Sequence, residues 1–245
     1  MKWIYSESAI DKLYKMWGKL GWGNTIGLYN DEVDIEELIA ETTFAARYDG
    51  RLLPALMTWI RDYGDLINKR KLLRFLNQAD TALLGAVLEI AMKYGGSENF
   101  APIIKQCHPL KSMEVLIKGV DDVETYITWQ KEYSKEEFRK WGFYCATIDF
   151  YEDAFRAREW ILQNNRILVL RAVFGANIRS EILFCLEKHS KMGIRALSKE
   201  LGYAYSGVYR EIEDFQRNGL MIEEKRHGRI VKLSGKMKKI LSSTT

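Results

Sequence analysis

The chain has 245 residues, of which 47% are hydrophobic and 29% charged, with only three prolines. This composition is typical of a globular protein with a buried core, and the scarcity of proline favours helices. No apolar run approaches the roughly 18 residues that a membrane-spanning helix needs, and the N-terminus lacks a secretory signal. We therefore expect a cytoplasmic protein without a membrane partner. Cys107, Cys145 and Cys185 are far apart with no CxxC pair, which excludes a disulfide framework and a zinc ribbon.

The positive charge is concentrated in the last third of the chain. Residues 176–245 hold 14 Lys and Arg against 8 Asp and Glu, a net charge of +6, whereas residues 1–175 hold 23 against 25. The stretch KRHGRIVKLSGKMKK at 225–239 carries seven basic side chains and no acidic one. Such asymmetry indicates binding to phosphates of nucleic acid, or less readily to an anionic membrane surface.

Apolar residues at helical spacing predict an all-helical domain at 1–175. Ile10, Leu13 and Trp17 mark a first helix before a glycine-containing loop at 21–27. Asp34 with Glu37 predicts the start of a second helix, and Pro54 suits the first turn of a third. Further helices are expected at about 65–77, 80–94, 97–107, 121–133, 135–147 and 150–163, with Ser134 and Glu137 as another capping box.

The stretch FGAN at 174–177 is the expected hinge to a second domain at 176–245. Just before it, ILVLRAV at 167–173 fits either a strand or a buried helix, and its modest β-branched content favours the end of a helix.

The second domain is predicted to be helix, helix, turn, helix and hairpin. One helix runs from Ile178 to about His189, and a short one at 193–201 is stopped by Gly202, where the turn favours positive φ. Ser206 is the expected N-cap of a third helix that ends at Asn218. That helix buries Val208, Ile212 and Phe215, and the strands MIEEK and RIVKL follow it, joined by RHG.

This segment, over about residues 178–234, resembles the winged-helix DNA-binding core of MarR- and ArsR-type regulators. The features shared with that core are the Leu201-Gly202 pair before the turn, Ser206 at the start of the third helix, and the closing Gly219-Leu220. The cysteine pairs of the metal-sensing ArsR members are absent, so the resemblance does not imply metal sensing.

The resemblance implies that the third helix enters the major groove of double-stranded DNA while the hairpin touches the adjacent backbone or minor groove. Arg210 would then bond a guanine edge, Tyr209 would contact a thymine methyl or a phosphate, and Gly207 would let the backbone come close. The implied base readers are Tyr205, Ser206, Gly207, Tyr209 and Arg210; the implied phosphate contacts are Lys199, Lys225, Arg226, His227 and Arg229.

The sequence contains no motif typical of a metal site or of an active site. Cys185 and His189 are spaced for two metal ligands on one helix, but no companion pair is present, so the sequence predicts no metal and no cofactor. No Ser-His-Asp order, phosphate-binding loop or HExxH motif occurs, and no catalytic residue is predicted.

Two features of the N-terminal part leave alternatives open. All seven tryptophans lie there, and they fit a core better than an aromatic pocket for a ligand or partner. The stretch at 47–76 mixes basic and aromatic residues, which fits a solvated helical face or a second nucleic-acid contact.

Together these observations predict a non-enzymatic, homodimeric transcriptional regulator that reads double-stranded DNA. The alternative is an interaction subunit of a toxin–antitoxin or defence-type complex, whose winged helix binds protein or RNA. An enzyme with a pocket among the N-terminal helices is a third possibility, for which no motif argues.

Overall fold

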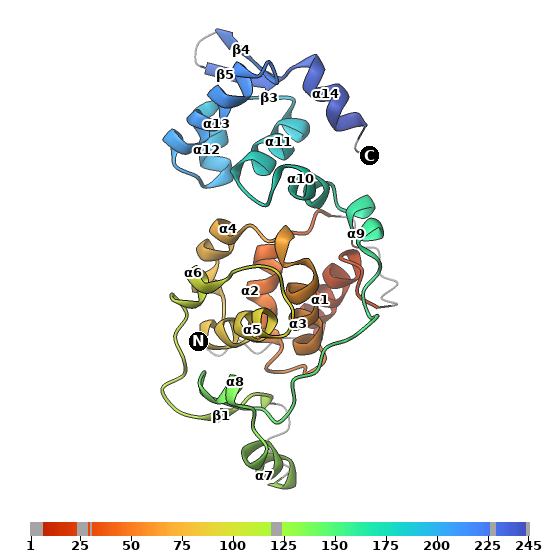
Figure 1. Ribbon diagram of the computed structural model, residues 1–245, viewed down its shortest axis with the longest axis vertical. Helices are drawn as coiled ribbons and strands as arrows, with labels where there is room; N and C mark the ends of the chain where they lie inside the picture. Colours follow the sequence, from red (N-terminus) through yellow and green to blue (C-terminus); the bar gives the residue numbers. More distant parts are fainter. Residues whose placement is uncertain (1–6, 24–28, 30, 119–123, 226–228, 244–245) are drawn as a thin grey trace. The chain divides into compact units, whose positions relative to one another are not determined.

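The computed structural model describes residues 7–23, 29, 31–118, 124–225 and 229–243 (Figure 1). The chain forms two compact units, Met1–Asn164 and Asn165–Thr245. The mainly α fold class is confirmed, with a small antiparallel sheet near the C-terminus. Within the described ranges, no helix has the length and apolarity to cross a membrane.

The first unit is built from helices of very different lengths. The long ones are α1 (Glu7–Lys19), α2 (Ile35–Ala45), α3 (Leu52–Tyr63) and α5 (Thr81–Lys93). Shorter elements connect and cover them: η1 (Gly64–Leu66), α4 (Lys69–Arg74), η2 (Leu76–Gln78), α6 (Ala101–Ile104), β1 (Glu114–Val115), α7 (Glu124–Glu132), α8 (Glu136–Arg139), β2 (Phe143–Tyr144) and α9 (Arg158–Asn164).

Helix α5 is the centre of the first core. Its sequence is apolar on nearly every side, and α2, α3, α6 and α8 pack around it. Gly85 lies so close to the Trp141 ring that a Cβ there would come within 2.3 Å of it. Trp17 and Trp59 are fully buried and meet edge to face at 6.2 Å between ring centroids. These tryptophans therefore act as core residues, as their spacing predicted.

Arg47 joins three parts of this unit. Its guanidinium donates to Asp80 at the start of α5 (3.3 Å), to Glu114 in β1 (2.7 Å) and to the Leu116 carbonyl (3.2 Å). Strand β1 pairs in parallel with β2, a contact that the all-helical prediction did not anticipate. Each of these strands has only two residues, too few for an alternation of side chains to be recognised.

The second unit begins with α10 (Arg166–Phe174) and α11 (Ile178–His189), so the stretch at 167–173 is helical as expected. Then come β3 (Lys191–Gly193), α12 (Ile194–Leu201), α13 (Tyr205–Arg217), β4 (Met221–Lys225), β5 (Arg229–Leu233) and α14 (Gly235–Ser242). The strands form an antiparallel sheet in the order β3-β5-β4. Both hairpin strands have the predicted bounds, and β3 adds a third strand that was not predicted.

One apolar cluster holds these elements together. Helix α11 contributes Ile182, Leu183 and Leu186, and α12 contributes Ile194 and Leu197. From α13, the predicted residues Val208, Ile212 and Phe215 are all buried, and the sheet adds Met221, Val231 and Leu233. Gly202 ends α12 with φ of +65°, the left-handed conformation expected of the turn.

Several predicted boundaries were wrong for local reasons. The helix expected at 135–147 stops at Arg139, because the chain turns at Gly142 (φ +87°) into β2. The helix expected at 150–163 begins only at Arg158, and those expected at 65–77 and 97–107 are shorter or broken. Asp34 does cap α2 by accepting from the Glu37 amide, as predicted.

Two predicted N-caps were also wrong. Ser206 lies inside α13, whose N-cap is Ala204, because the Ser198 hydroxyl donates to the Tyr203 carbonyl and fixes the turn before it. Ser134 does not cap α8: its hydroxyl accepts from the Cys145 amide and so connects the segment before α8 to the end of β2.

A buried ion pair connects α10 to α11, and its removal should lower the free energy of unfolding of the second unit. The Arg171 guanidinium donates to the Glu181 carboxylate at 2.7 and 3.1 Å, and both side chains are almost inaccessible. We expect Arg171→Ala to cost about 3–5 kcal/mol, because it leaves a buried carboxylate without its partner.

Amide hydrogen exchange of α10 and α11 in the intact chain measures this loss, since the tryptophans all lie in the first unit and would not report it. The control is Arg217→Ala, which removes an exposed pair with Asp214 and should cost less than about 1 kcal/mol. Equal protection of α11 in both variants would contradict the assignment.

Candidate nucleic-acid interface

Helix α13 has one buried face and one outward face. Because Val208, Ile212 and Phe215 point into the core, helical phase turns Ser206, Arg210, Glu213 and Arg217 to the opposite side. Ser206, Arg210 and Arg217 are exposed, and Glu213 is half-buried. Arg210 has no ion-pair partner among the described residues. The outward face therefore offers a free guanidinium close to the start of the helix.

The carboxylates of α13 are mostly neutralised inside the unit. The Arg179 guanidinium of α11 donates to Glu211 at 2.7 Å and lies 3.6 Å from Asp214, which also pairs with Arg217. The hydrogen bond to Glu211 raises the pKa of the Arg179 guanidinium. Glu213 is the carboxylate that faces outward, and no ion pair holds it within the described parts of the chain.

Two tyrosines connect α13 to the hairpin. The rings of Tyr205 and Tyr209 stack with centroids 5.9 Å apart, and the Arg229 guanidinium of β5 lies 4.5 Å from the centre of the Tyr209 ring. Arg229 also donates to Glu223 of β4 at 2.8 and 3.0 Å, and this bond raises its pKa. The structure thus brings together three residues that the sequence analysis selected: Tyr205, Tyr209 and Arg229.

Helix α12 adds two basic side chains beside this stack. Arg195 and Lys199 are four residues apart, exposed and without ion-pair partners in the described parts of the chain. Arg195, Tyr205 and Arg229 line one hollow of about 430 Å³. Sequence reasoning selected Lys199 but missed Arg195, although the spacing of the two on an amphipathic helix places them on the same face.

The N-terminus of α13 opens beside this hollow. Its N-cap is Ala204, and no described side chain caps it. The first amide groups of a helix that lack a capping partner attract anions, and phosphate in particular. Arg195 lines the same hollow as Tyr205, the first residue of α13.

The described lysines of the basic run at 225–239 are divided between the sheet and α14. Lys236, Lys238 and Lys239 are exposed on α14, which lies on the other side of α11 from α12 and α13 (Figure 1). Lys232 pairs with Glu224 in the sheet. Arg226 and His227 lie outside the described residues, as does the side chain of Lys225. Among the described side chains, Arg195, Lys199 and Arg210 of α12 and α13 are the exposed cations without ion-pair partners on these two helices.

Gly207 lies on the side of α13 that faces α11, unlike the outward-facing residues. It is half-buried, and a Cβ built on it would lie 3.8 Å from the Cδ1 atom of Ile178. Gly207 therefore faces α11, and a small side chain would fit there in ordinary van der Waals contact.

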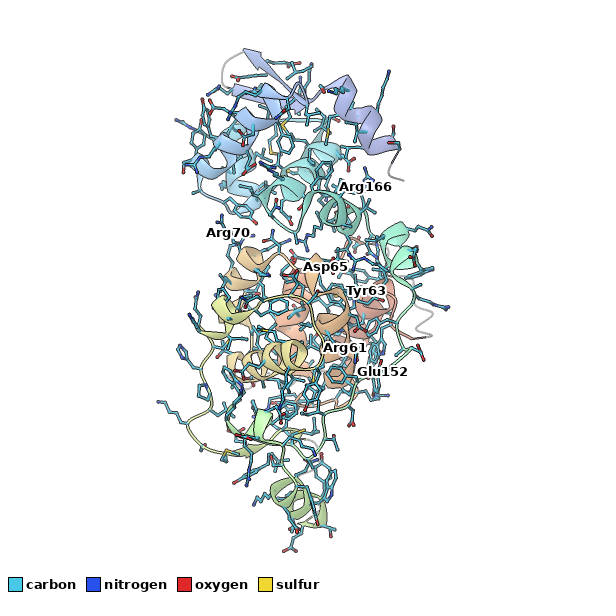
Figure 2. All side chains as sticks on the ribbon, in the orientation of Figure 1. Arg61, Tyr63, Asp65, Arg70, Glu152 and Arg166 are labelled. Atoms are coloured by element: carbon cyan, nitrogen blue, oxygen red, sulfur yellow. The ribbon has the colours of Figure 1, made fainter. Side chains whose placement is uncertain are left out.

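The basic residues of 47–76 are largely paired within the first unit. Arg61 and Glu152 point toward each other (Figure 2), with a hydrogen bond of 2.7 Å. Arg51 pairs with Asp49, and Lys71 with Asp34. Arg70 on α4 is exposed and lacks an ion-pair partner among the described residues. These pairings favour a solvated helical surface over a second nucleic-acid contact.

Comparisons of this chain with protein-family models, with curated proteins and with solved structures return no match.

Replacing Gly207 by alanine tests on which side of α13 DNA would lie. Gly207→Ala should stabilise the second unit by up to about 1 kcal/mol, because alanine favours the helix and the added methyl group only touches Ile178. Since Gly207 faces α11, DNA affinity should change by less than about twofold, or ~0.4 kcal/mol. Thermal unfolding and fluorescence anisotropy with labelled duplex measure the two effects. A large loss of affinity would place DNA against Gly207, as the family resemblance implies.

Proposed function

We propose that the second unit is a winged helix-turn-helix and that the chain is a DNA-binding transcriptional regulator. The order of α11, β3, α12, α13 and the β4–β5 hairpin supports this, with Gly202 making the turn between α12 and α13. In this proposal α13 is the recognition helix, and the hairpin is the wing. The regulator would act as a homodimer, because one short helix reads few base pairs. Analytical ultracentrifugation of the intact chain tests the homodimer, which should have a molecular mass of twice 28.5 kDa.

The observation that carries the proposal is the set of exposed, unpaired cations on α12 and α13. Arg195, Lys199 and Arg210 are exposed and have no ion-pair partners in the described ranges. Such cations can contact phosphates without first breaking a bond inside the protein, and each contact releases counterions from the duplex. Arg195 would hold a phosphate at the start of α13, which fixes the register of the helix in the groove.

In this proposal the outward side of α13 contacts the base edges. The Arg210 guanidinium can donate two hydrogen bonds to O6 and N7 of guanine, and the Ser206 hydroxyl can either donate or accept. The stack of Tyr205, Tyr209 and Arg229 would set the position of the wing against the recognition helix. Arg229 shares its charge with Glu223, so its phosphate contact is the weaker one.

Removing two of the unpaired cations should weaken binding to random-sequence duplex and make it less sensitive to salt. In Arg195→Ala/Arg210→Ala, the slope of log K against log salt concentration should fall in magnitude by about 0.9 for each lost phosphate contact. Anisotropy titration of the intact chain at several salt concentrations measures the slope.

Arg70→Ala is the matched control, because it removes an exposed, unpaired arginine from a helix of the first unit. It should leave affinity and slope unchanged. If the double variant and the control bind equally, or if the parent chain binds DNA only feebly with no dependence on salt, then the regulator proposal fails. A protein or RNA partner would then be the function to seek.

Removing the negative charge of Glu213 on the same helix should have the opposite effect on affinity. Its carboxylate faces outward near Arg210, so it should repel phosphates and can accept a hydrogen bond from the cytosine amino group. Glu213→Gln should therefore tighten binding to random duplex while it reduces discrimination between sequences in a selection from a randomised pool. Glu211→Gln is the control: Glu211 pairs with Arg179, so that change should not tighten binding. Weaker random-duplex binding by Glu213→Gln would contradict the orientation of α13.

A further inference from the structure

Three side chains with metal-binding atoms meet between α11 and α12. The Cys185 thiol donates to the Glu200 carboxylate at 3.4 Å, and the Nε2 atom of His189 lies 2.9 Å from the same oxygen. The three ligand atoms all lie within 4.8 Å of one another. The sequence offered only the Cys185–His189 pair, and the fold adds the third residue from the next helix.

The fold fixes these residues by packing around them. Cys185 and His189 are one helical turn apart and so lie on the same side of α11. Glu200 lies near the end of α12, which Ile194 and Leu197 anchor in the core. Cys185 is buried with 4% of its surface exposed, whereas the side chains of His189 and Glu200 are 39% and 45% exposed. The cluster thus has a buried sulfur at its base and an open side toward solvent.

We propose that Cys185, His189 and Glu200 bind one Zn²⁺ ion, with water as the fourth ligand. A set of one sulfur, one nitrogen and one oxygen suits zinc and disfavours Ca²⁺ and Mg²⁺, which prefer oxygen alone. Tetrahedral zinc needs ligand atoms about 3.3–3.6 Å apart, given its usual bond lengths. The Cys185 sulfur and the His189 nitrogen lie 3.4 and 2.9 Å from the Glu200 oxygen and within 4.8 Å of each other, so side-chain rotations have to bring all three separations to these values.

Binding would join the end of α11 to the end of α12. The thiol proton of Cys185 leaves to solvent, and the resulting Zn–S bond replaces the hydrogen bond to Glu200. Because the ion contacts both helices just before the Gly202 turn, it would stabilise the arrangement of α11 and α12. This effect does not depend on whether the unit binds DNA.

Co²⁺ is the probe for the site, because four-coordinate cobalt absorbs strongly in the visible range and a Co–S bond adds a near-ultraviolet charge-transfer band. The intact chain, freed of metal with a chelator, should bind one equivalent of Co²⁺ with both signals, and Zn²⁺ should displace it. Zn²⁺ should also raise the unfolding temperature. His189→Ala should weaken binding by more than the roughly 10–100-fold that outer-shell partners contribute.

Cys185→Ser should abolish the charge-transfer band, and Cys107→Ser is the control, since Cys107 is a buried thiol of the first unit. His189 is exposed, so its variant reports on the site even if the change at Cys185 disturbs the core. Absence of the sulfur band in the parent chain, or its persistence in Cys185→Ser, would overturn the proposal. The cluster would then be a hydrogen-bonded group in which Glu200 accepts from Cys185 and His189.

Discussion

The orientation of α13 depends on the burial of one apolar stripe. Val208, Ile212 and Phe215 enter a core formed by α11, α12 and the sheet, and this burial leaves the chain no freedom to rotate the helix. The opposite side, with Ser206 and Arg210, must then face solvent. A slip of one residue in either direction would turn the Glu213 or the Glu211 carboxylate toward the core and move the apolar stripe out of it, at a cost of several kcal/mol. The candidate interface is thus a consequence of core packing.

The pairing of charges decides which part of the second unit is available to an anion. The net charge of residues 176–245 is positive, yet several of the cations already pair with Glu211, Asp214, Glu223 and Glu224. Among the described residues, α12 and α13 contribute Arg195, Lys199 and Arg210, which have no ion-pair partners. A count of charges along the sequence singled out the run at 225–239, whose lysines on α14 lie on the other side of α11 from α12 and α13.

Sequence patterns correctly predicted the features of the second unit that depend on the local spacing of residues. The stripe of α13, the turn at Gly202 and the bounds of both hairpin strands follow from spacing within a few residues, and all agree with the structure. The predictions that were wrong or missing concern contacts between residues that are distant in the sequence. Ser206 is not a cap because Ser198 fixes the turn, and Glu200 meets Cys185 only when α12 folds against α11. No pattern along the chain carries such information.

The central claim is that the outward side of α13 contacts DNA, and photo-crosslinking tests it most directly. A photoreactive residue at Ser206, which is exposed and forms no part of the core, should crosslink the intact chain to duplex DNA in a manner that salt suppresses. The same residue at Arg70 in the first unit should not crosslink. Equal crosslinking from both positions, or none from Ser206 while Arg70 reacts, would contradict the account.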